Sequence, residues 1–230
     1  MKLISIIIAT LSTCLTVPSY AMDAGSHPVV IELFTSQGCS SCPPADRLIE
    51  KYADMPGVLP LSYHVDYWDR LGWKDPFSLP ESTGRQHLYS RFLGSGLYTP
   101  QAVIQGTQDV VGSNAIALRL AVKKAGEQQN WIPVTLQLSD NELHITLPET
   151  QGIHANLYLI GYQKHATTSV PRGENAGRTL SHRNSVTSIS RIRAWQGNEQ
   201  NLVQAIPPGD GVAVLVQSSD TGEVIGAGWL

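Results

Sequence analysis

The chain contains few cysteines, which limits what its thiols can build. It has 3 among 230 residues, and Cys14 lies in an apolar N-terminal stretch, so Cys39 and Cys42 are the pair in the body of the chain. Small secreted domains that depend on a disulfide framework are much richer in cysteine, and a chain of this length can bury a core without one. The sequence therefore excludes a disulfide-framework domain.

Long hydrophobic runs are also scarce, and the one present stands at the N-terminus. Lys2 precedes an almost uncharged apolar run over residues 3–17, and the sequence SYA, which ends at Ala21, matches a small-x-small cleavage site. About 15 apolar residues are fewer than the roughly 20 that span a bilayer. We predict a signal peptide over residues 1–21 and an exported protein, periplasmic or secreted, that starts near Met22 and has no integral membrane segment after cleavage.

Charge is sparse and unevenly distributed. Charged residues make up 15% of the chain and the net charge is −3, which gives no indication of a nucleic-acid partner. Phosphate-binding loops, dinucleotide fingerprints and Ser-His-Asp motifs are missing as well. Residues 163–195, however, contain Glu174 as their one acidic residue against six basic ones. The basic residues are Lys164, Arg172, Arg178, Arg183, Arg191 and Arg193.

The hydrophobic pattern divides the chain into two parts near residue 128. Residues 22–127 alternate apolar strands with helical segments in the order β-α-β-α-β-β-α, which predicts an α/β domain. Residues 128–230 show short alternating strands separated by turn residues, which predicts a mostly antiparallel, β-sandwich-like domain. The expected strands of the first part are 29–35, 58–66, 99–106 and 109–112, and the expected helices are 43–55, 81–93 and 113–126.

The chemistry of the first part centres on the stretch "LFTSQGCSSCPPADRL". Cys39 and Cys42 lie between a predicted strand and a predicted helix, and Pro43 and Pro44 suit a first helical turn. The positive end of a helix lowers a thiol pKa, so we expect Cys39 to be the attacking thiolate and Cys42 the resolving thiol. The same spacing also occurs in zinc sites.

These features resemble the thioredoxin superfamily. The resemblance rests on the order of elements, the Cys39-Ser40-Ser41-Cys42 motif and the Thr99-Pro100 pair before the third strand. It implies a thioredoxin-like domain, a cis peptide bond at Pro100 opposite the dithiol, and a peptide-binding role for Thr99 and Pro100. Ser-Ser between the cysteines departs from the Gly-Pro of thioredoxin itself and leaves the direction of electron flow open.

A closer resemblance is to bacterial secreted proteins known as domain-of-unknown-function family 1223. It rests on "IELFTSQGCSSCPPAD", on "YHVDYWD" at 63–69, on "YTPQ" at 98–101 and on "GENAGRTL" at 173–180. These motifs extend over most of the mature chain. The resemblance implies a thioredoxin-like fold with an appended β-domain and brings no established substrate.

Two other residues have open roles. Glu32 lies in the first apolar strand, where it would either take the proton of Cys42 from beneath the dithiol or face solvent at the rim. His64 could join Cys39 and Cys42 as a ligand of copper(I) or another soft metal, or be an ordinary residue of the sheet.

The basic stretch at 170–186 also has two interpretations. It could be an irregular lid that carries Arg178, His182 and Arg183 to the dithiol, where cations would stabilise a thiolate or bind an acidic substrate. Alternatively, it is a solvated surface loop.

Together these patterns predict an exported thiol-disulfide oxidoreductase. Its redox-active Cys39–Cys42 disulfide would act on a protein or small thiol substrate and exchange electrons with a redox partner, without a dissociable cofactor. Two alternatives are a copper(I) or other soft-metal binding protein that uses the cysteines, with or without His64, and a non-catalytic interaction module.

Overall fold

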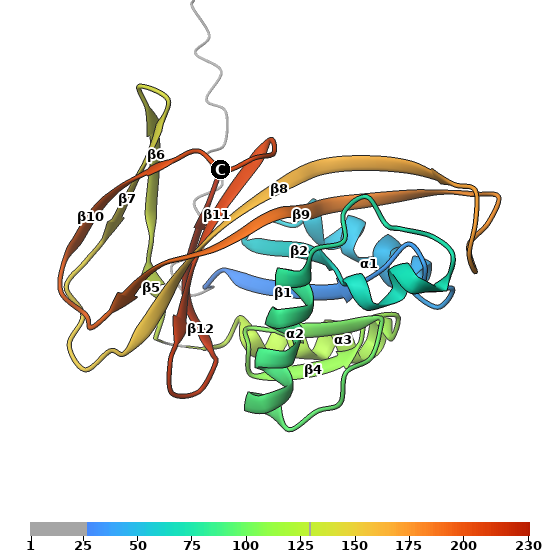
Figure 1. The fold of residues 1–230 in the computed structure, drawn as a ribbon. Helices are drawn as coiled ribbons and strands as arrows, with labels where there is room; N and C mark the ends of the chain where they lie inside the picture. Colours follow the sequence, from blue (N-terminus) through green and yellow to red (C-terminus); the bar gives the residue numbers. More distant parts are fainter. Residues whose placement is uncertain (1–26, 129) are drawn as a thin grey trace, which may run out of the picture.

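A computed structural model describes residues 27–128 and 130–230. The predicted signal peptide, residues 1–21, lies outside the described residues. Within that part, twelve strands and three α-helices are present, and most strands join one nine-stranded mixed sheet with the order β4-β3-β1-β2-β9-β8-β11-β12-β5 (Figure 1). Three further strands form a small sheet with the order β10-β7-β6.

The elements have the following bounds. The strands are β1 (Val29–Thr35), β2 (Val58–His64), β3 (Gln101–Ile104), β4 (Gln108–Val111), β5 (Ile132–Pro133), β6 (Thr135–Ser139), β7 (Glu142–Leu147), β8 (Ala155–Val170), β9 (Arg178–Trp195), β10 (Gln200–Ala205), β11 (Gly211–Ser218) and β12 (Val224–Trp229). The helices are α1 (Pro43–Ala53), α2 (Pro80–Leu93) and α3 (Ala115–Ala125), with the 3-10 helix η1 (Asp66–Leu71).

The fold-class prediction, a thioredoxin-like α/β domain followed by a β-sandwich-like domain, was wrong. Strand β9 of the second half pairs in parallel with β2 of the first half at Ser62 and Ser185, so the strands of both halves build one sheet. The chain is mostly strand, and its helices are attached to one part of this sheet. Alternating hydrophobicity indicates which face of a strand is buried, but it does not indicate which strand lies beside it.

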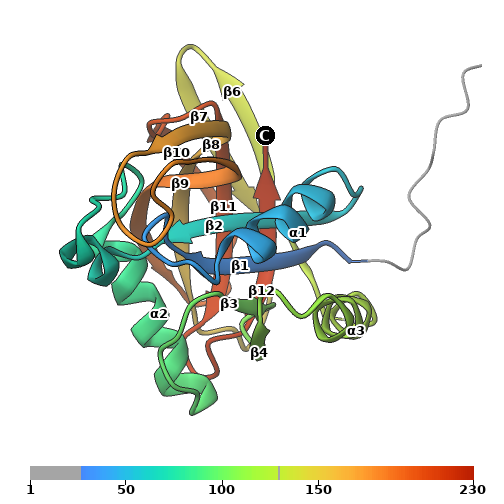
Figure 2. The same cartoon turned by 90° about the vertical axis from the view of Figure 1, so that its right-hand side faces the viewer.

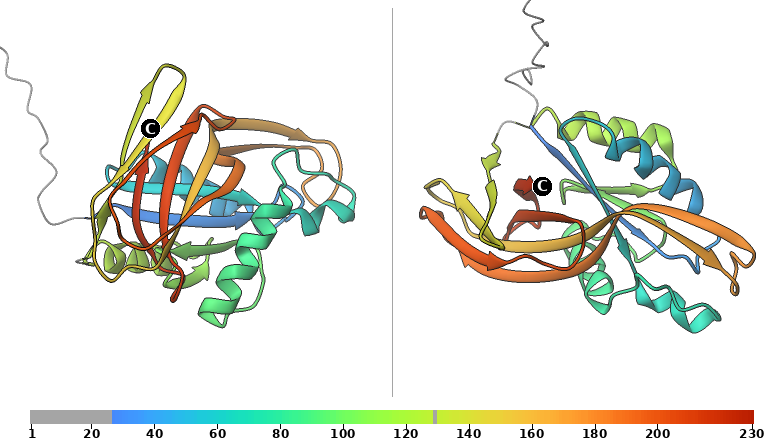
Figure 3. Two further views of the ribbon diagram at one scale, coloured as in Figure 1. Left: turned by 60° about the vertical axis from the view of Figure 1, so that its left-hand side comes forward. Right: turned by 90° about the horizontal axis from the view of Figure 1, so that it is seen from above.

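The helices cover both faces of the first strands (Figures 2 and 3). Strand β1 is buried throughout: Ile31 and Leu33 pack with α1 and α3, whereas Val30 and Phe34 face a second core that includes Tyr89 of α2. Such burial on two faces explains the nearly continuous apolar run of this strand. Helix α1 begins with two prolines that need no hydrogen-bond acceptor, and α3 is capped by Asn114, whose Oδ1 accepts from Ala117 N at 3.1 Å.

Strands β8 and β9 form a long hairpin that crosses the molecule and extends alongside α1, from Asp54 just after the helix to Ser40 just before it (Figure 1). Their pairing runs from Ala155 and Trp195 to Val170 and Arg178. The predicted irregular stretch at 170–186 is therefore mostly strand. Only residues 171–177 form the turn, and we call them the hairpin tip.

The small sheet packs on the far part of the large one. Leu143, Ile145 and Leu147 of β7 share a core with Leu157 of β8 and Val214 of β11. No described helix is long and apolar enough to cross a membrane.

Candidate functional site: a buried disulfide and its polar surroundings

Cys39 and Cys42 form a disulfide between the end of β1 and the start of α1, with their Cα atoms 5.4 Å apart. Both residues have 0% exposed surface, although Ser40 and Ser41 between them are exposed. Cys42 immediately precedes α1, and its carbonyl accepts hydrogen bonds from the first turn of that helix. The sequence thus placed the pair correctly between strand and helix, while its complete burial was not expected.

Two hydroxyl groups contact the sulfur of Cys39. Ser41 Oγ lies 3.3 Å and Thr99 Oγ1 3.4 Å from Cys39 Sγ. The indole of Trp68 in η1 donates to Thr99 Oγ1 at 2.9 Å and so orients this hydroxyl. The Thr99–Pro100 peptide bond is cis, which confirms the prediction for this position. The structure therefore brings Thr99 to the dithiol.

The hairpin tip lies against residues 36–42, which we call the cysteine loop. Asn175 Nδ2 donates to the carbonyl oxygens of Gln37 and Cys39, at 2.9 Å each, and its side chain is fully buried. Glu174 Oε2 accepts from the backbone N–H of Ser40 at 3.0 Å. Arg178 reaches this contact indirectly, because it donates to Asn175 Oδ1 at 3.0 Å.

Arg183 lies elsewhere. Its Nη2 donates to Asp54 Oδ1 at 2.9 Å, just beyond the C-terminal end of α1. The expected pair of arginines over the dithiol is thus replaced by one amide and one carboxylate from the hairpin tip, with Arg178 supporting the amide. Both of these side chains belong to the "GENAG" segment, between its two glycines.

Glu32 is buried but engaged away from the cysteines. Its carboxylate forms a two-pronged ion pair with Arg85 of α2, with Arg85 Nη2 2.9 Å from Oε1, and it accepts a hydrogen bond from Tyr89. Gln217 of β11 completes the group by hydrogen-bonding both Arg85 and Tyr89. Glu32 is therefore not exposed to solvent, and its contacts link β1 to α2 rather than to the cysteines.

A chain of buried titratable side chains lies beneath the cysteine loop; the sequence analysis named His64 and His182 in other roles and missed Asp46 and Asp75. His64 Nδ1 lies 2.7 Å from Asp75 Oδ2, and the same carboxylate oxygen accepts from the backbone N–H of Gln37 at 2.8 Å. The ring of His182 stands edge-on to that of His64, with 4.7 Å between centroids. The chain ends at Asp46 of α1, which is 3.8 Å from His182 Nδ1 and accepts from Thr35 Oγ1 at 2.9 Å.

The pKa values in this chain move in opposite directions. Burial raises the pKa of Asp46 to about 7, despite the attraction of His64. Burial, reinforced by the charge of His64, lowers the pKa of His182 to about 3. Burial opposes the charge on His64 and Asp75 as well, but their mutual attraction and hydrogen bond outweigh it, so the pKa of His64 is raised and that of Asp75 is lowered to about 2. Near neutral pH, Asp75 is ionised, His182 is neutral and Asp46 is close to its midpoint, and the raised pKa of His64 favours its protonated form beside Asp75.

These four residues come from four separate segments, namely α1, β2, β9 and the connection before α2. Their sequence spacing therefore carries no motif. The sequence indicated the position of Asp46 only indirectly, because Asp46 lies four residues after Cys42, on the helix that follows the dithiol.

The soft-metal alternative involving His64 stays a prediction. Both ring nitrogens of His64 face protein groups, Nδ1 facing Asp75 and Nε2 lying 3.5 Å from Ser185 Oγ. Within residues 27–128 and 130–230, no group of three or more His, Cys, Asp and Glu side chains is arranged to hold a metal ion.

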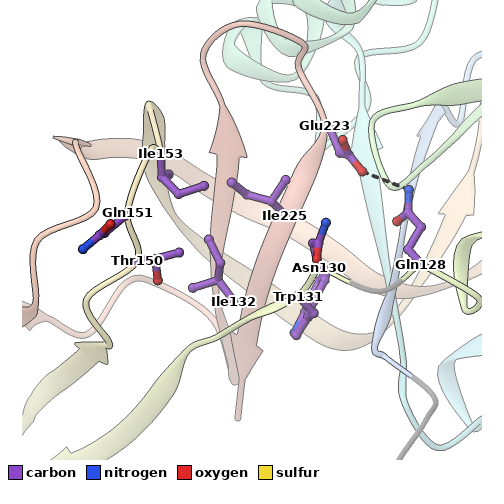
Figure 4. Close-up of a pocket in the computed structure, with 9 residues that line it drawn as sticks. All are labelled: Gln128, Asn130, Trp131, Ile132, Thr150, Gln151, Ile153, Glu223 and Ile225. Carbon is purple, nitrogen blue, oxygen red and sulfur yellow. Dashed lines mark hydrogen bonds between the residues drawn. The ribbon is translucent and has the colours of Figure 1, made fainter.

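A cavity of about 750 Å³ lies apart from the dithiol, near the β5 edge of the large sheet (Figure 4). Ile132 and Ile225 line it together with Trp131, and Glu223, which also lines it, accepts from Gln128 at 2.9 Å. Its described lining contains neither cysteine nor histidine.

The fold and site define a mixed-sheet protein in which a long hairpin closes over a buried C-x-x-C disulfide. The chain belongs to the family described as protein of unknown function (DUF1223), which matches residues 30–217. The resemblance to domain-of-unknown-function family 1223 is thereby confirmed. A search of curated proteins finds no match.

Two solved structures are similar to this chain. Protein AGR_C_4864 from Agrobacterium tumefaciens is 32% identical with a TM-score of 0.77, and the match covers 89% of this chain and 94% of that one. HBP35 of Porphyromonas gingivalis is 17% identical with a TM-score of 0.65, over 89% of this chain and 75% of that one. The second likeness concerns the fold alone.

Proposed function

We propose that this protein is an exported thiol-disulfide oxidoreductase with a dithiol site of the thioredoxin type. The supporting observation is the Cys39–Cys42 disulfide at the start of α1, with the hydroxyl groups of Ser41 and Thr99 on the sulfur of Cys39. A reactive dithiol needs this kind of setting, because hydroxyl donors and the positive end of a helix stabilise the thiolate over the thiol. The substrate is a protein or small thiol in its disulfide or dithiol form.

The exchange proceeds in two balanced steps. In the reducing direction, the Cys39 thiolate attacks a substrate disulfide, forms a mixed disulfide and releases one substrate sulfur as a thiolate. The Cys42 thiolate then attacks Cys39 Sγ, re-forms the Cys39–Cys42 bond and releases the second substrate sulfur. Two electrons pass to the substrate, and a dithiol redox partner restores the reduced enzyme. Reversal of these steps oxidises a substrate dithiol.

Asp46 is the proton acceptor for Cys42 in this proposal. It is buried one helical turn after Cys42, and its pKa of about 7 lets it exchange a proton near neutral pH. Thr35 holds one carboxylate oxygen, and His182 lies beside the other. Glu32, the carboxyl expected from the sequence, is instead occupied by Arg85.

Thr99 and Pro100 form the substrate side of the site. Thr99 combines a hydroxyl on Cys39 with a carbonyl oxygen that lies 3.4 Å from Ser41 Oγ, next to the exposed part of the cysteine loop. The indole N–H of Trp68 holds the side chain of Thr99 by donating to its hydroxyl oxygen. An extended peptide that pairs with the Thr99 backbone would bring its sulfur beside Cys39.

Mixed-disulfide trapping tests this function. We expect Cys42→Ala to accumulate a stable mixed disulfide through Cys39, because the resolving sulfur is missing. The protein is expressed with its own export signal, exported fractions are acid-quenched, and partners are identified after non-reducing electrophoresis and mass spectrometry. Cys39→Ala is the matched control and should trap no partner or far less. Equal trapping by the two variants would reverse or remove the roles assigned to the cysteines, and no trapping by either would contradict the proposal.

A further inference from the structure

We infer that the hairpin tip is a gate over the Cys39–Cys42 disulfide, and that exchange requires Asn175 and Glu174 to release the cysteine loop. This inference extends the proposed function, since it identifies what controls access to the same site. It concerns the disulfide itself and can be tested with a simple dithiol that needs no natural substrate.

The burial of the disulfide makes opening necessary. An attacking thiolate must approach a sulfur of the disulfide along the S–S axis, and neither Cys39 nor Cys42 has exposed surface. Ser40 and Ser41 are exposed, so the loop is at the surface while its sulfur atoms are covered. In the closed structure, therefore, a partner can touch the loop but cannot react with it.

The hairpin tip holds the backbone of the cysteine loop through three side-chain hydrogen bonds. Asn175 is the one buried side chain of the hairpin tip, and it holds the carbonyls of Gln37 and Cys39. Glu174 adds the hydrogen bond from Ser40 N–H. A Cβ on Gly173 would lie 3.1 Å from Trp73 Cβ, so the tip also packs closely against Trp73.

The tip is built to move separately from its hairpin. Strand pairing stops at Val170 and Arg178, and the turn hydrogen bonds beyond it are local to the tip and its base. Gly173 and Gly177 have φ values of +79° and +78°, a conformation that glycine adopts without strain, and they lie on either side of the two residues that hold the loop. Rotation at these positions can lift Glu174 and Asn175 while β8 and β9 stay paired.

Disulfide exchange kinetics test the gate. The oxidised wild-type protein is reduced with dithiothreitol, the reduced protein is reoxidised with oxidised dithiothreitol, and both rates are followed by quenched alkylation. Asn175→Ala loses two hydrogen bonds that hold the closed state, so we expect both rates to increase on the order of tenfold. Glu174→Ala loses one, and we expect a smaller increase on the order of threefold. A gate changes access in both directions, so the ratio of the rates, and with it the reduction potential, stays the same.

Two controls separate gating from general loosening. Arg183→Ala removes an arginine of the same hairpin that contacts Asp54 rather than the cysteine loop, and Ile145→Val weakens the distant core of the small sheet. Both should exchange at the wild-type rate. Wild-type rates in both Asn175→Ala and Glu174→Ala would overturn the gate, as would an acceleration in one direction only, which would mean that the contacts tune the potential. Glu174 is exposed, so its variant keeps the test decisive if Asn175→Ala does not fold.

Discussion

Replacing Arg85 with methionine is expected to lower the free energy of unfolding by about 3–5 kcal/mol. The guanidinium is buried between the carboxylate of Glu32 and the rings of Tyr63, Tyr89 and Tyr158, with its central carbon 4.9–5.6 Å from the ring centroids. Methionine fills a similar volume but leaves the carboxylate of Glu32 buried without its charge partner. Equilibrium unfolding in urea, with the disulfide intact, measures the loss.

The matched control is Arg119→Met, the same substitution at an exposed position of α3, which should change stability by less than about 0.5 kcal/mol. The double variant Glu32→Leu with Arg85→Met should recover much of the loss, because two apolar side chains replace the pair. A loss below about 1 kcal/mol for Arg85→Met alone would contradict the view that this ion pair joins α2 to β1.

The local elements near the dithiol were predictable because their signals are local. The apolar run at 29–35 became β1 with the same bounds, the prolines marked the start of α1, and Asn114 capped α3 as a residue of its type does. The prediction was less complete elsewhere: η1 in the first half and β10 in the second were not predicted, and the strand character of residues 178–186 was hidden by their basic and polar side chains. Where a strand covers a polar site instead of an apolar core, its residues do not alternate clearly between apolar and polar, so the sequence pattern does not indicate a strand.

The arrangement of the sheet and the centre of the site could not be derived in the same way. Ser62 and Ser185 pair although they are far apart in the sequence, and neither residue indicates its partner. Asp46 looks like an ordinary helix residue in the sequence, and His182, expected near the dithiol, gave no sign that it would lie beside Asp46. Conversely, Arg183, one position later, was expected at the dithiol as well. In a strand, adjacent side chains point to opposite faces, so the choice between His182 and Arg183 depends on a register that only the pairing defines.

The pH dependence of stability should reveal the buried state of Asp46. Its pKa is about 7 in the folded protein against 3.8 ordinarily, so between these pH values the folded state keeps a proton that the unfolded state has released. The contribution of Asp46 to stability is therefore present below about pH 4 and is lost as pH rises to about 7, a total of roughly 4 kcal/mol at 1.36 kcal/mol per pKa unit. An amide side chain at this position cannot titrate, so Asp46→Asn should escape this loss.

His182 contributes with the opposite sign. Its pKa is lowered from 6.5 to about 3, so its contribution is present above pH 6.5 and is lost as pH falls toward 3. In the wild-type protein the two contributions largely cancel between pH 4 and 6.5. Asp46→Asn should remove the cancellation, and its stability should rise over this range while that of the wild type changes less.

The decisive quantity is the difference in unfolding free energy between Asp46→Asn and the wild type, measured in urea at pH 5 and pH 8. We expect it to shift by about 2–3 kcal/mol in favour of the variant, because about two of the three pKa units are crossed in this interval. The exposed Asp140→Asn controls for loss of a surface carboxylate and should show no comparable shift. A constant difference for Asp46→Asn would mean that Asp46 is ionised throughout. A carboxylate in that state could not alternate between its two forms near neutral pH, and its assignment as the proton acceptor for Cys42 would fail with it.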